Sequence, residues 1–335
     1  MTKRRSPPTI AAPGRSVTPI ASRHYRDYRL HRLVEAKRDQ VVSLCIPAHD
    51  EAGTIGRIVT RARRYLVDRL GLVDEVLVMD DHSGDGTAEV AEAAGARVVS
   101  AADVLADVAG GSGKGEALWR SLYVAEGDIV VWCDADITDF GSRFVVGLLG
   151  PLLTDPAVSF VKGYYERPSL GGIGGGRTTE LMARPVLATL FPHLSTIVQP
   201  LSGEFGGRRS LLERLPFVRG YGVDIGLLID AAEEVGPAGI VQVDLGTRVH
   251  RNRTLDELGP QALTVLQAAL DRAGVRYENP ATLLRPGVPP LVKAFAELPP
   301  LATLPPRPPR PPRPPRPPGP RLPADAPPAV ATLTA

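Results

Sequence analysis

Residues 129–136, which read Ile-Val-Val-Trp-Cys-Asp-Ala-Asp, constrain the possible folds more than any other part of this chain. The β-branched and aromatic residues at 129–132 favour a buried strand. Side chains two positions apart on an extended segment point the same way, so Asp134 and Asp136 can face one ligand. Adjacent carboxylates repel each other unless a cation lies nearby, and Mg²⁺ is commonly held by one or two carboxylates together with phosphate oxygens. The stretch therefore predicts a strand that ends at a metal–diphosphate site, and a solvated turn is the alternative.

The first half of the chain alternates between apolar segments and segments with a helical spacing of apolar residues. The expected strands are residues 41–47, 75–79, 96–100 and 129–132, and the expected helices are 54–70, a segment beginning at Thr87, and 114–124. Thr54 is expected to be the N-cap of the first helix. This alternation predicts an α/β fold whose mostly parallel sheet, flanked by helices, binds its ligand at the carboxyl edge.

Composition and charge exclude several classes of function. The formal net charge of the 335-residue chain is +2, so no global positive field indicates binding to nucleic acid. Cys45 and Cys133 lie within apolar runs, which is typical of reduced core cysteines. No apolar run approaches about 18 residues, and no apolar segment follows the basic N-terminus, so we expect neither a membrane span nor a secretory signal. The default prediction is a cytoplasmic protein with no integral membrane contact.

Three strand ends in the first half carry motifs that resemble those of a known family. They are Pro-Ala-His-Asp-Glu at 47–51, Asp-Asp-His-Ser-Gly-Asp-Gly-Thr at 80–87 and Asp-Ala-Asp at 134–136. In order and spacing they resemble the family A (GT-A) nucleotide-sugar glycosyltransferases over roughly residues 40–140. The resemblance implies a GT-A-type, Rossmann-like sheet, a nucleoside diphosphate clamped between the first two strands, and a metal ion on the Asp-x-Asp motif.

The residue types at these positions suit a nucleotide-sugar site. A carboxylate at a strand end can bind uracil or ribose hydroxyls. Lys114 offers a mobile positive charge for phosphate, and a solvated lysine at a helix start is the alternative. By the resemblance, the nucleotide-sugar contacts are Pro47, Ala48, His49, Glu51, Asp80, Ser83, Lys114, Asp134 and Ala135.

Motifs in the second half narrow the resemblance. They lie at residues 174–180, 199–205, 222–226 and 248–253. With the first set, they are similar to those of the retaining glucosyl-3-phosphoglycerate synthases of actinobacterial type over about residues 25–275, which implies a C-terminal acceptor-binding part. Three positions depart from that family's pattern: Asp50 stands in place of an asparagine, Ala135 in place of a serine, and Asp224 in place of a longer glutamate.

The glycine-rich residues 171–176 and the arginine after them suit an anionic acceptor. Successive backbone N–H groups in such a turn can bind phosphate, and Arg177 can grip it through two parallel hydrogen bonds. A flexible surface loop is the alternative. By the resemblance, the contacts to 3-phosphoglycerate are Gly175, Gly176, Arg177, Thr178, Thr179 and Asn252.

Together with these features, the resemblance implies transfer of glucose from UDP-glucose to the 2-hydroxyl of 3-phosphoglycerate with retention of anomeric configuration. The resemblance implies that Asp136 and His250 hold Mg²⁺ or Mn²⁺, which acts as a Lewis acid on the departing UDP. Glu204 is expected to hydrogen-bond the glucose hydroxyls, and a structural carboxylate is the alternative. The predicted catalytic residues are Asp134, Asp136, Glu204 and Asp224. Double displacement and same-face attack both stay open.

Two other functions also stay open. One is a different GT-A transferase, such as a mannosyl-3-phosphoglycerate synthase or a polyprenyl-phosphate glycosyltransferase. The other is a non-catalytic scaffold that binds nucleotide sugars, although such a protein would not need Asp134, Asp136, His250 and Lys114 together. A homodimer is the expected assembly.

The chain is expected to divide into four parts. They are a disordered N-terminal extension at 1–22, the nucleotide-sugar-binding half at 23–150, the acceptor-binding half with C-terminal helices at 151–298, and a Pro/Arg-rich disordered tail at 299–335. Residues 23–38 are predicted to form an amphipathic helix, and Leu283, Leu291 and Val292 to pack on the body. The Pro-Pro-Arg repeats of the tail favour extended polyproline II, and a basic ligand for an aromatic-lined groove is the alternative reading of this tract.

Overall fold

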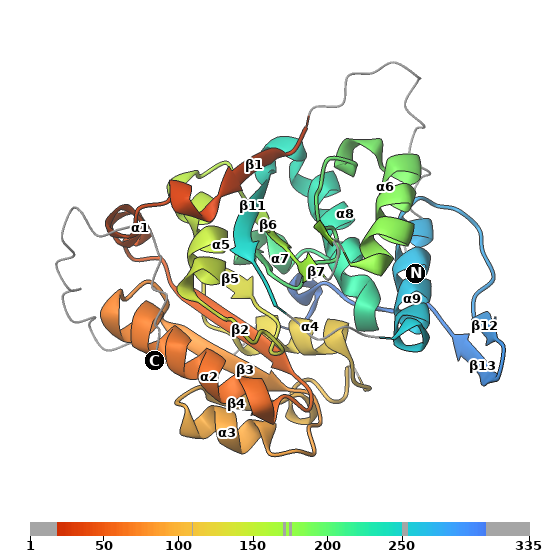
Figure 1. Cartoon of the computed structure of the whole chain (residues 1–335), viewed down its shortest axis with the longest axis horizontal. Coiled ribbons are helices and arrows are strands. Elements are labelled where there is room, and N and C mark those ends of the chain that lie inside the picture. Colours follow the sequence, from red (N-terminus) through yellow and green to blue (C-terminus); the bar gives the residue numbers. More distant parts are fainter. Residues whose placement is uncertain (1–18, 109, 170–171, 174–175, 250–253, 306–335) are drawn as a thin grey trace.

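An eight-stranded sheet forms the centre of the protein, whose computed structural model describes residues 19–108, 110–169, 172–173, 176–249 and 254–305 (Figure 1). Its strands lie in the order β1-β11-β6-β9-β5-β2-β3-β4. Their bounds are β1 Ala21–His24, β2 Val42–Ala48, β3 Glu75–Asp80, β4 Arg97–Ser100, β5 Ile129–Trp132, β6 Phe160–Glu166, β9 Phe205–Arg208 and β11 Ile240–Thr247. Neighbouring strands are parallel except that β9 runs antiparallel to both β5 and β6. The predicted mostly parallel α/β sheet is confirmed.

Helices cover both faces of the sheet, over two apolar cores. One core is covered by α1 (Leu30–Lys37), α2 (Ala52–Ala62), α3 (Thr87–Ala93) and α5 (Ser142–Thr154). The other is covered by α4 (Lys114–Val124), α6 (Arg184–Leu190), α7 (Arg209–Leu212), α8 (Val223–Val235) and α9 (Leu255–Arg272). π-Helical turns adjoin α2 at Arg63–Arg69 and α6 at Thr179–Ala183. Among the described residues, no helix is long and apolar enough to cross a membrane.

The central strands explain why polar residues gather at one edge of the sheet. β2, β3 and β5 consist almost wholly of buried residues because helices cover both sheet faces. Ala48 pairs with Asp80, so β2 and β3 end side by side. β9 runs the opposite way and therefore begins at the edge where its neighbours end. That edge collects the segments that follow β2, β3, β5, β6 and β11, together with the residues that precede β9.

Residues 23–38 do not form the single helix that their pattern predicts. β1 ends at His24, a 3-10 turn follows at Tyr25–Asp27, and α1 begins only at Leu30. β1 lies beside β11, in register from Ala21 opposite Val241. Backbone pairing with a distant strand therefore overrides the local helical pattern.

Two boundaries in the first half also differ from the prediction. The expected disordered extension at 1–22 is too long, because its last two residues belong to β1. Residues 1–18 lie outside the described part of the chain. Thr54 is not an N-cap, since α2 already begins at Ala52. Its hydroxyl instead donates a 2.7 Å hydrogen bond to the carbonyl of Ala135 and ties α2 to the turn after β5.

Short two-stranded sheets complete the second half. They pair β7 (Pro168–Ser169) with β8 (Gly172–Ile173), β10 (Phe217–Val218) with β14 (Glu297–Leu298), and β12 (Ala281–Arg285) with β13 (Val288–Lys293). Figure 1 shows the β12–β13 hairpin projecting beside α9. Val292 is 59% exposed on this hairpin, so its predicted packing on the body is wrong, while Leu283 and Leu291 are half-buried.

The predicted tail starts too early at residue 299. Trp119 Nε1 donates a 2.8 Å hydrogen bond to the carbonyl of Pro299, and the side chain of Leu301 is buried. The first residues of the predicted tail therefore pack on α4 and the core beneath it. Residues 306–335 lie outside the described part of the chain.

Deleting the chain from Pro305 onward is expected to leave the melting temperature and turnover unchanged, because the Pro-Pro-Arg tract offers no apolar face. Deleting from Pro299 is the matched comparison. It removes the burial of Leu301, worth roughly 1.5–3 kcal/mol, and the partner of Trp119, so the melting temperature should fall by several degrees. Thermal denaturation of both truncated proteins checks this. A fall of several degrees for the shorter deletion would show that the Pro/Arg tract itself stabilises the body.

Candidate active site

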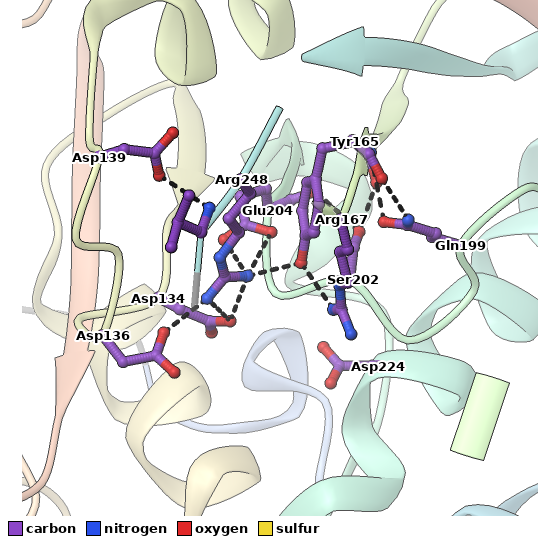
Figure 2. A network of polar contacts seen from close by, with 12 residues as sticks. Asp134, Asp136, Asp139, Tyr165, Arg167, Gln199, Ser202, Glu204, Asp224 and Arg248 are labelled. Carbon is purple, nitrogen blue, oxygen red and sulfur yellow. Dashed lines mark hydrogen bonds and ion pairs between the residues drawn. The ribbon is translucent and has the colours of Figure 1, made fainter. Parts of the chain in front are cut away.

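One guanidinium group joins the carboxylates after β5 to residues of the neighbouring strands (Figure 2). Arg248 Nη2 donates to Asp136 Oδ1 at 2.5 Å and lies 3.3 Å from Asp134 Oδ2. Arg248 Nη1 donates to Tyr165 Oη at 2.5 Å and to Glu204 Oε2 at 3.1 Å. The Arg248 side chain is only 3% exposed, so these contacts replace the water that its charge would otherwise hold.

The sheet topology brings these residues together from distant parts of the sequence. The two aspartates follow β5, Tyr165 lies near the end of β6, and Arg248 follows β11. Glu204 reaches the same edge because β9, which it precedes, is antiparallel. A Cβ on Gly203 would lie 2.0 Å from Asp134 Oδ1, so only glycine at this position lets the carboxylate lie against the backbone.

Lys114 lies between two carboxylates and not in open solvent. Its Nζ is 3.0 Å from Asp224 Oδ2 and 3.3 Å from Asp134 Oδ1, and 14% of its side chain is exposed. Burial alone would lower the pKa of Lys114, but the two carboxylates outweigh burial and raise that pKa above its usual value. The predicted mobility of Lys114 is therefore wrong. It is a fixed cation that links the Asp-x-Asp segment to the first turn of α8, and its contact with phosphate stays a prediction.

Burial and neighbouring charges shift the carboxyl groups in opposite directions. Glu204 is fully buried, which raises its pKa to about 7 against the lowering effect of Arg248. Burial opposes ionisation of Asp134 too, but Lys114 and Arg248 outweigh it and hold the pKa of Asp134 below its usual value. Burial raises the pKa of Asp224. Since Glu204 has no exposed surface, its packing favours support of Arg248 over the expected contact with glucose hydroxyls.

Sequence analysis missed two cations of this cluster. Lys162, in β6, is buried, lies 4.6 Å from the centroid of the Phe205 ring, and has no hydrogen-bond partner among the described residues. Burial lowers the pKa of Lys162 to about 8, against the carboxylate of Asp224. A lysine between apolar and aromatic residues of a strand is the sequence signal that identifies it. Sequence analysis included Arg248 only as the first residue of the motif at 248–253 and assigned it no role. A cation directly after a strand, at the edge of the sheet where ligand binds, is itself a signal of a functional residue.

The predicted nucleotide contacts after β2 and β3 lie side by side. His49 Nδ1 is 2.7 Å from the carbonyl oxygen of Asp81, and the backbone N–H of Asp50 donates to Ser83 Oγ at 3.0 Å. The structure thus brings to one edge Pro47, Ala48, His49, Glu51, Asp80 and Ser83. Ala135 is buried and its carbonyl accepts the hydrogen bond from α2, so only its backbone is placed near a ligand. The nucleotide contacts themselves stay predictions.

The predicted acceptor residues are described in part. Gly175 and Asn252 lie outside the described residues. Arg177 and Thr178 form a helical turn with Arg177 exposed, and Thr179 is buried behind them. Gly176 lies against Arg167, since a Cβ on this glycine would be 2.7 Å from Arg167 Nη1. Arg177 is exposed and directly follows Gly176, and its acceptor role stays a prediction.

The carboxylates after β5 fit a divalent metal ion. Their oxygens are the hard ligands that Mg²⁺ and Mn²⁺ prefer, and the Asp136 side chain is 30% exposed. Its Oδ1 already binds one positive group, that of Arg248, while its Oδ2 accepts no hydrogen bond from the described residues. The predicted second ligand, His250, lies outside the described residues. Within the described part of the chain no group of three or more His, Cys, Asp or Glu side chains could hold a metal. Of the expected pair, Asp136 lies within the described residues, and its role as a metal ligand stays a prediction.

Comparison with known proteins agrees with this geometry. Residues 43–214 match the family Glycosyl transferase family 2. A glucosyl-3-phosphoglycerate synthase of Petrotoga mobilis is 44% identical over 244 residues, which cover 71% of this chain and 75% of that protein. A glucosyl-3-phosphoglycerate synthase of Mycolicibacterium smegmatis is 48% identical over 248 residues, which cover 72% of this chain and 81% of that protein.

Solved structures match over a larger part of the chain. The crystal structure of the Mycobacterium tuberculosis glucosyl-3-phosphoglycerate synthase with Mn²⁺, UDP-glucose and phosphoglyceric acid has a TM-score of 0.78 and 43% identity, and covers 85% of this chain and 98% of that chain. Other structures of that enzyme hold Mg²⁺ with UDP, or Mn²⁺ with UDP and glucosyl-3-phosphoglycerate. The chain therefore belongs to glycosyl transferase family 2 and, within it, to the glucosyl-3-phosphoglycerate synthases.

Proposed function

We propose that this protein transfers glucose from UDP-glucose to the 2-hydroxyl of 3-phosphoglycerate, with retention of anomeric configuration. The observation that carries the proposal is the cluster of Arg248 with Asp134 and Asp136, between the strand ends that suit a nucleotide and the segment that carries Arg177. The relatives named for this activity support it, and so do the structures of the tuberculosis enzyme with donor, acceptor and product.

Residues of this chain would prepare the site before substrates arrive. When bound by Asp136 and His250, Mg²⁺ or Mn²⁺ would neutralise negative charge that develops on the departing UDP. Arg248 and Lys114 fix the ionised carboxylate of Asp134 in one orientation. Groups that are already oriented need little reorganisation as charge develops, which is the usual source of electrostatic catalysis.

The packing of the buried carboxylates bears on how retention is achieved. Glu204 has no exposed surface, and Asp224 is only 4% exposed. Asp224 Oδ2 accepts a hydrogen bond from Lys114, and its Oδ1 is buried. Neither presents an open carboxylate oxygen to an anomeric carbon. In our proposal the acceptor hydroxyl therefore attacks from the face that UDP leaves, in preference to a double displacement.

The experiment that tests the function is a transfer assay with the purified protein, Mg²⁺, UDP-glucose and 3-phosphoglycerate. We expect UDP and a glucosylated phosphoglycerate in equal amounts, with the α configuration of the donor kept in the product. GDP-glucose and GDP-mannose are run beside UDP-glucose. Turnover with GDP-mannose alone, or binding of UDP-glucose without any transfer, would contradict the proposal.

Arg177 is expected to bind the acceptor and not the donor. Replacing it by Ala removes one charge-assisted fork, worth on the order of 1.5–3 kcal/mol, or about ten- to a hundredfold in affinity for 3-phosphoglycerate. Binding of UDP-glucose, measured by calorimetry without acceptor, should change little. Lys at this position should restore only part of the affinity, because a point charge cannot make two parallel hydrogen bonds. If Arg177→Ala lowered the affinities for UDP-glucose and for 3-phosphoglycerate equally, the segment that carries Arg177 would belong to the donor site instead.

Location and assembly form a separate part of the proposal. We place the protein in the cytoplasm, which the two buried free cysteines support, because thiols stay reduced there. The predicted homodimer also stays a proposal, and the elution volume of the full chain in size-exclusion chromatography with light scattering tests it.

A further inference from the structure

Arg167 is a second guanidinium group in the network of Figure 2, and the function proposed above does not use it. It directly follows β6, and its Nη2 donates a 3.0 Å hydrogen bond to Tyr165 Oη. The same phenol oxygen accepts the 2.5 Å hydrogen bond from Arg248 Nη1. One buried hydroxyl therefore stands between the arginine that holds the Asp-x-Asp carboxylates and a second arginine further out.

Arg167 differs from Arg248 in having no anionic partner. Arg248 pairs with three carboxylates, whereas no Asp or Glu among the described residues forms an ion pair with Arg167. Its Nε is buried without a hydrogen-bond partner, and its Nη1 makes no hydrogen bond to a described residue. A partly buried guanidinium with unused donors is costly unless an anion binds there, because burial removes water from the charge. These donors point to an anionic ligand.

The surroundings of Arg167 place this ligand between the backbone that precedes Arg177 and the network around Asp134. Its Nη1 lies 2.7 Å from the point that a Cβ on Gly176 would occupy, so the guanidinium touches the backbone just before Arg177. On its other side, Tyr165 and Arg248 connect it to Asp134. Arg167 therefore lies between the predicted phosphate-binding arginine and the carboxylates beside which sugar transfer would occur.

We propose that Arg167 binds the carboxylate of the acceptor while Arg177 binds its phosphate; this inference rests on the function proposed above. In 3-phosphoglycerate the carboxylate is bonded directly to the carbon that carries the attacking hydroxyl, whereas a methylene and an ester oxygen separate the phosphate from that carbon. When the hydroxyl lies beside the Asp-x-Asp segment, the carboxylate is the nearer anion. Arg167 is connected to that segment by hydrogen bonds through Tyr165 and Arg248. A planar guanidinium matches a carboxylate through two parallel hydrogen bonds.

Glycerol 3-phosphate separates the two roles, because it keeps the phosphate and the 2-hydroxyl but lacks the carboxylate. Arg167→Met keeps an unbranched apolar stem and removes the guanidinium group with its charge. We expect this variant to raise the KM and the calorimetric Kd for 3-phosphoglycerate by about ten- to a hundredfold, with UDP and Mn²⁺ present in the calorimetry. The same two constants for glycerol 3-phosphate should rise by less than about threefold. Arg177→Met should weaken both acceptors alike. The preference of the protein for 3-phosphoglycerate over glycerol 3-phosphate should collapse only in the first variant.

Controls distinguish a ligand role from a structural one. Arg214→Met removes an exposed arginine paired with Glu234 at 2.9 Å, away from this network, and should leave both acceptors unaffected. Should Arg167→Met lower the melting temperature, Arg167→Lys supplies the test, since it keeps the charge and loses only the fork. Arg167→Lys should again lower the affinity for 3-phosphoglycerate and leave the affinity for glycerol 3-phosphate nearly unchanged.

Two outcomes would overturn the inference. Equal weakening of both acceptors by Arg167→Met and by Arg167→Lys would make Arg167 a phosphate or packing residue, and unchanged affinity for 3-phosphoglycerate would exclude it from the acceptor site. Failure of the proposed function looks different, because the unsubstituted protein would then neither bind nor glucosylate 3-phosphoglycerate.

Discussion

Replacing Asp136 by Ala is expected to reduce kcat by at least about a hundredfold, which is the usual cost of removing one group that stabilises charge in a transition state. The Asp136 side chain is 30% exposed, and its Oδ2 accepts no hydrogen bond from the described residues. Its loss should therefore remove the proposed protein ligand of the metal ion. The fold should survive, because Arg248 keeps its contacts with Asp134 and Glu204.

The measurement combines steady-state turnover with calorimetric binding of Mn²⁺ in the presence of UDP. EDTA should bring the unsubstituted protein down to the level of Asp136→Ala and have little further effect on the variant. Asp68→Ala, which removes an exposed aspartate on the π-helical turn after α2, is the matched control and should behave like the unsubstituted protein. Near-normal turnover of Asp136→Ala with EDTA present would contradict the metal-dependent mechanism.

Replacing Arg248 by Met is expected to destabilise the protein by about 3–5 kcal/mol, because it leaves the buried carboxylate of Glu204 without its cation and leaves Asp134 with Lys114 alone. The melting temperature should fall by on the order of 10 °C. Adding Glu204→Gln should recover part of this loss, since an uncharged amide does not need the cation. Denaturant unfolding of the two single variants and the double variant forms a double-mutant cycle that measures the coupling.

The loss caused by Arg248→Met should depend on pH in a defined direction. Burial already raises the pKa of Glu204 to about 7, and removing Arg248 takes away a charge that lowers it, so the pKa rises further. A carboxyl group whose pKa is higher in the folded than in the unfolded state contributes stability at low pH and loses it as pH rises through the folded pKa. The variant should therefore be nearest to the unsubstituted protein near pH 5 and furthest from it above pH 7. Arg214→Met, which removes an exposed ion pair, should show neither effect. A pH-independent loss, or strict additivity in the cycle, would contradict the assignment of Glu204 as the partner of Arg248.

Local sequence patterns determined the elements on the donor side of this protein. The apolar runs at 41–47, 75–79 and 129–132 form β2, β3 and β5, and the helix predicted at 114–124 is α4. The strand predictions are confirmed because a strand buried on both faces must be apolar along its whole length. The ligand edge could be predicted because parallel strands present their carboxyl ends together. The motifs at those ends also sufficed to indicate the family.

Tertiary structure alone decided how charge is distributed within the site. Arg248 meets Asp134 only because β11 and β5 end at one edge, and Glu204 joins them only because β9 is antiparallel. Lys114 is held instead of mobile because α8 brings Asp224 to it. A charged side chain has the same local signature whether it ends in water or against a carboxylate from a distant strand. Its burial and its partner depend on strand order and direction, which arise from the packing of the whole chain. The same reason explains β1, where Arg23 and His24, the first two residues of the predicted helix at 23–38, belong to an edge strand because β11 offers backbone groups beside them.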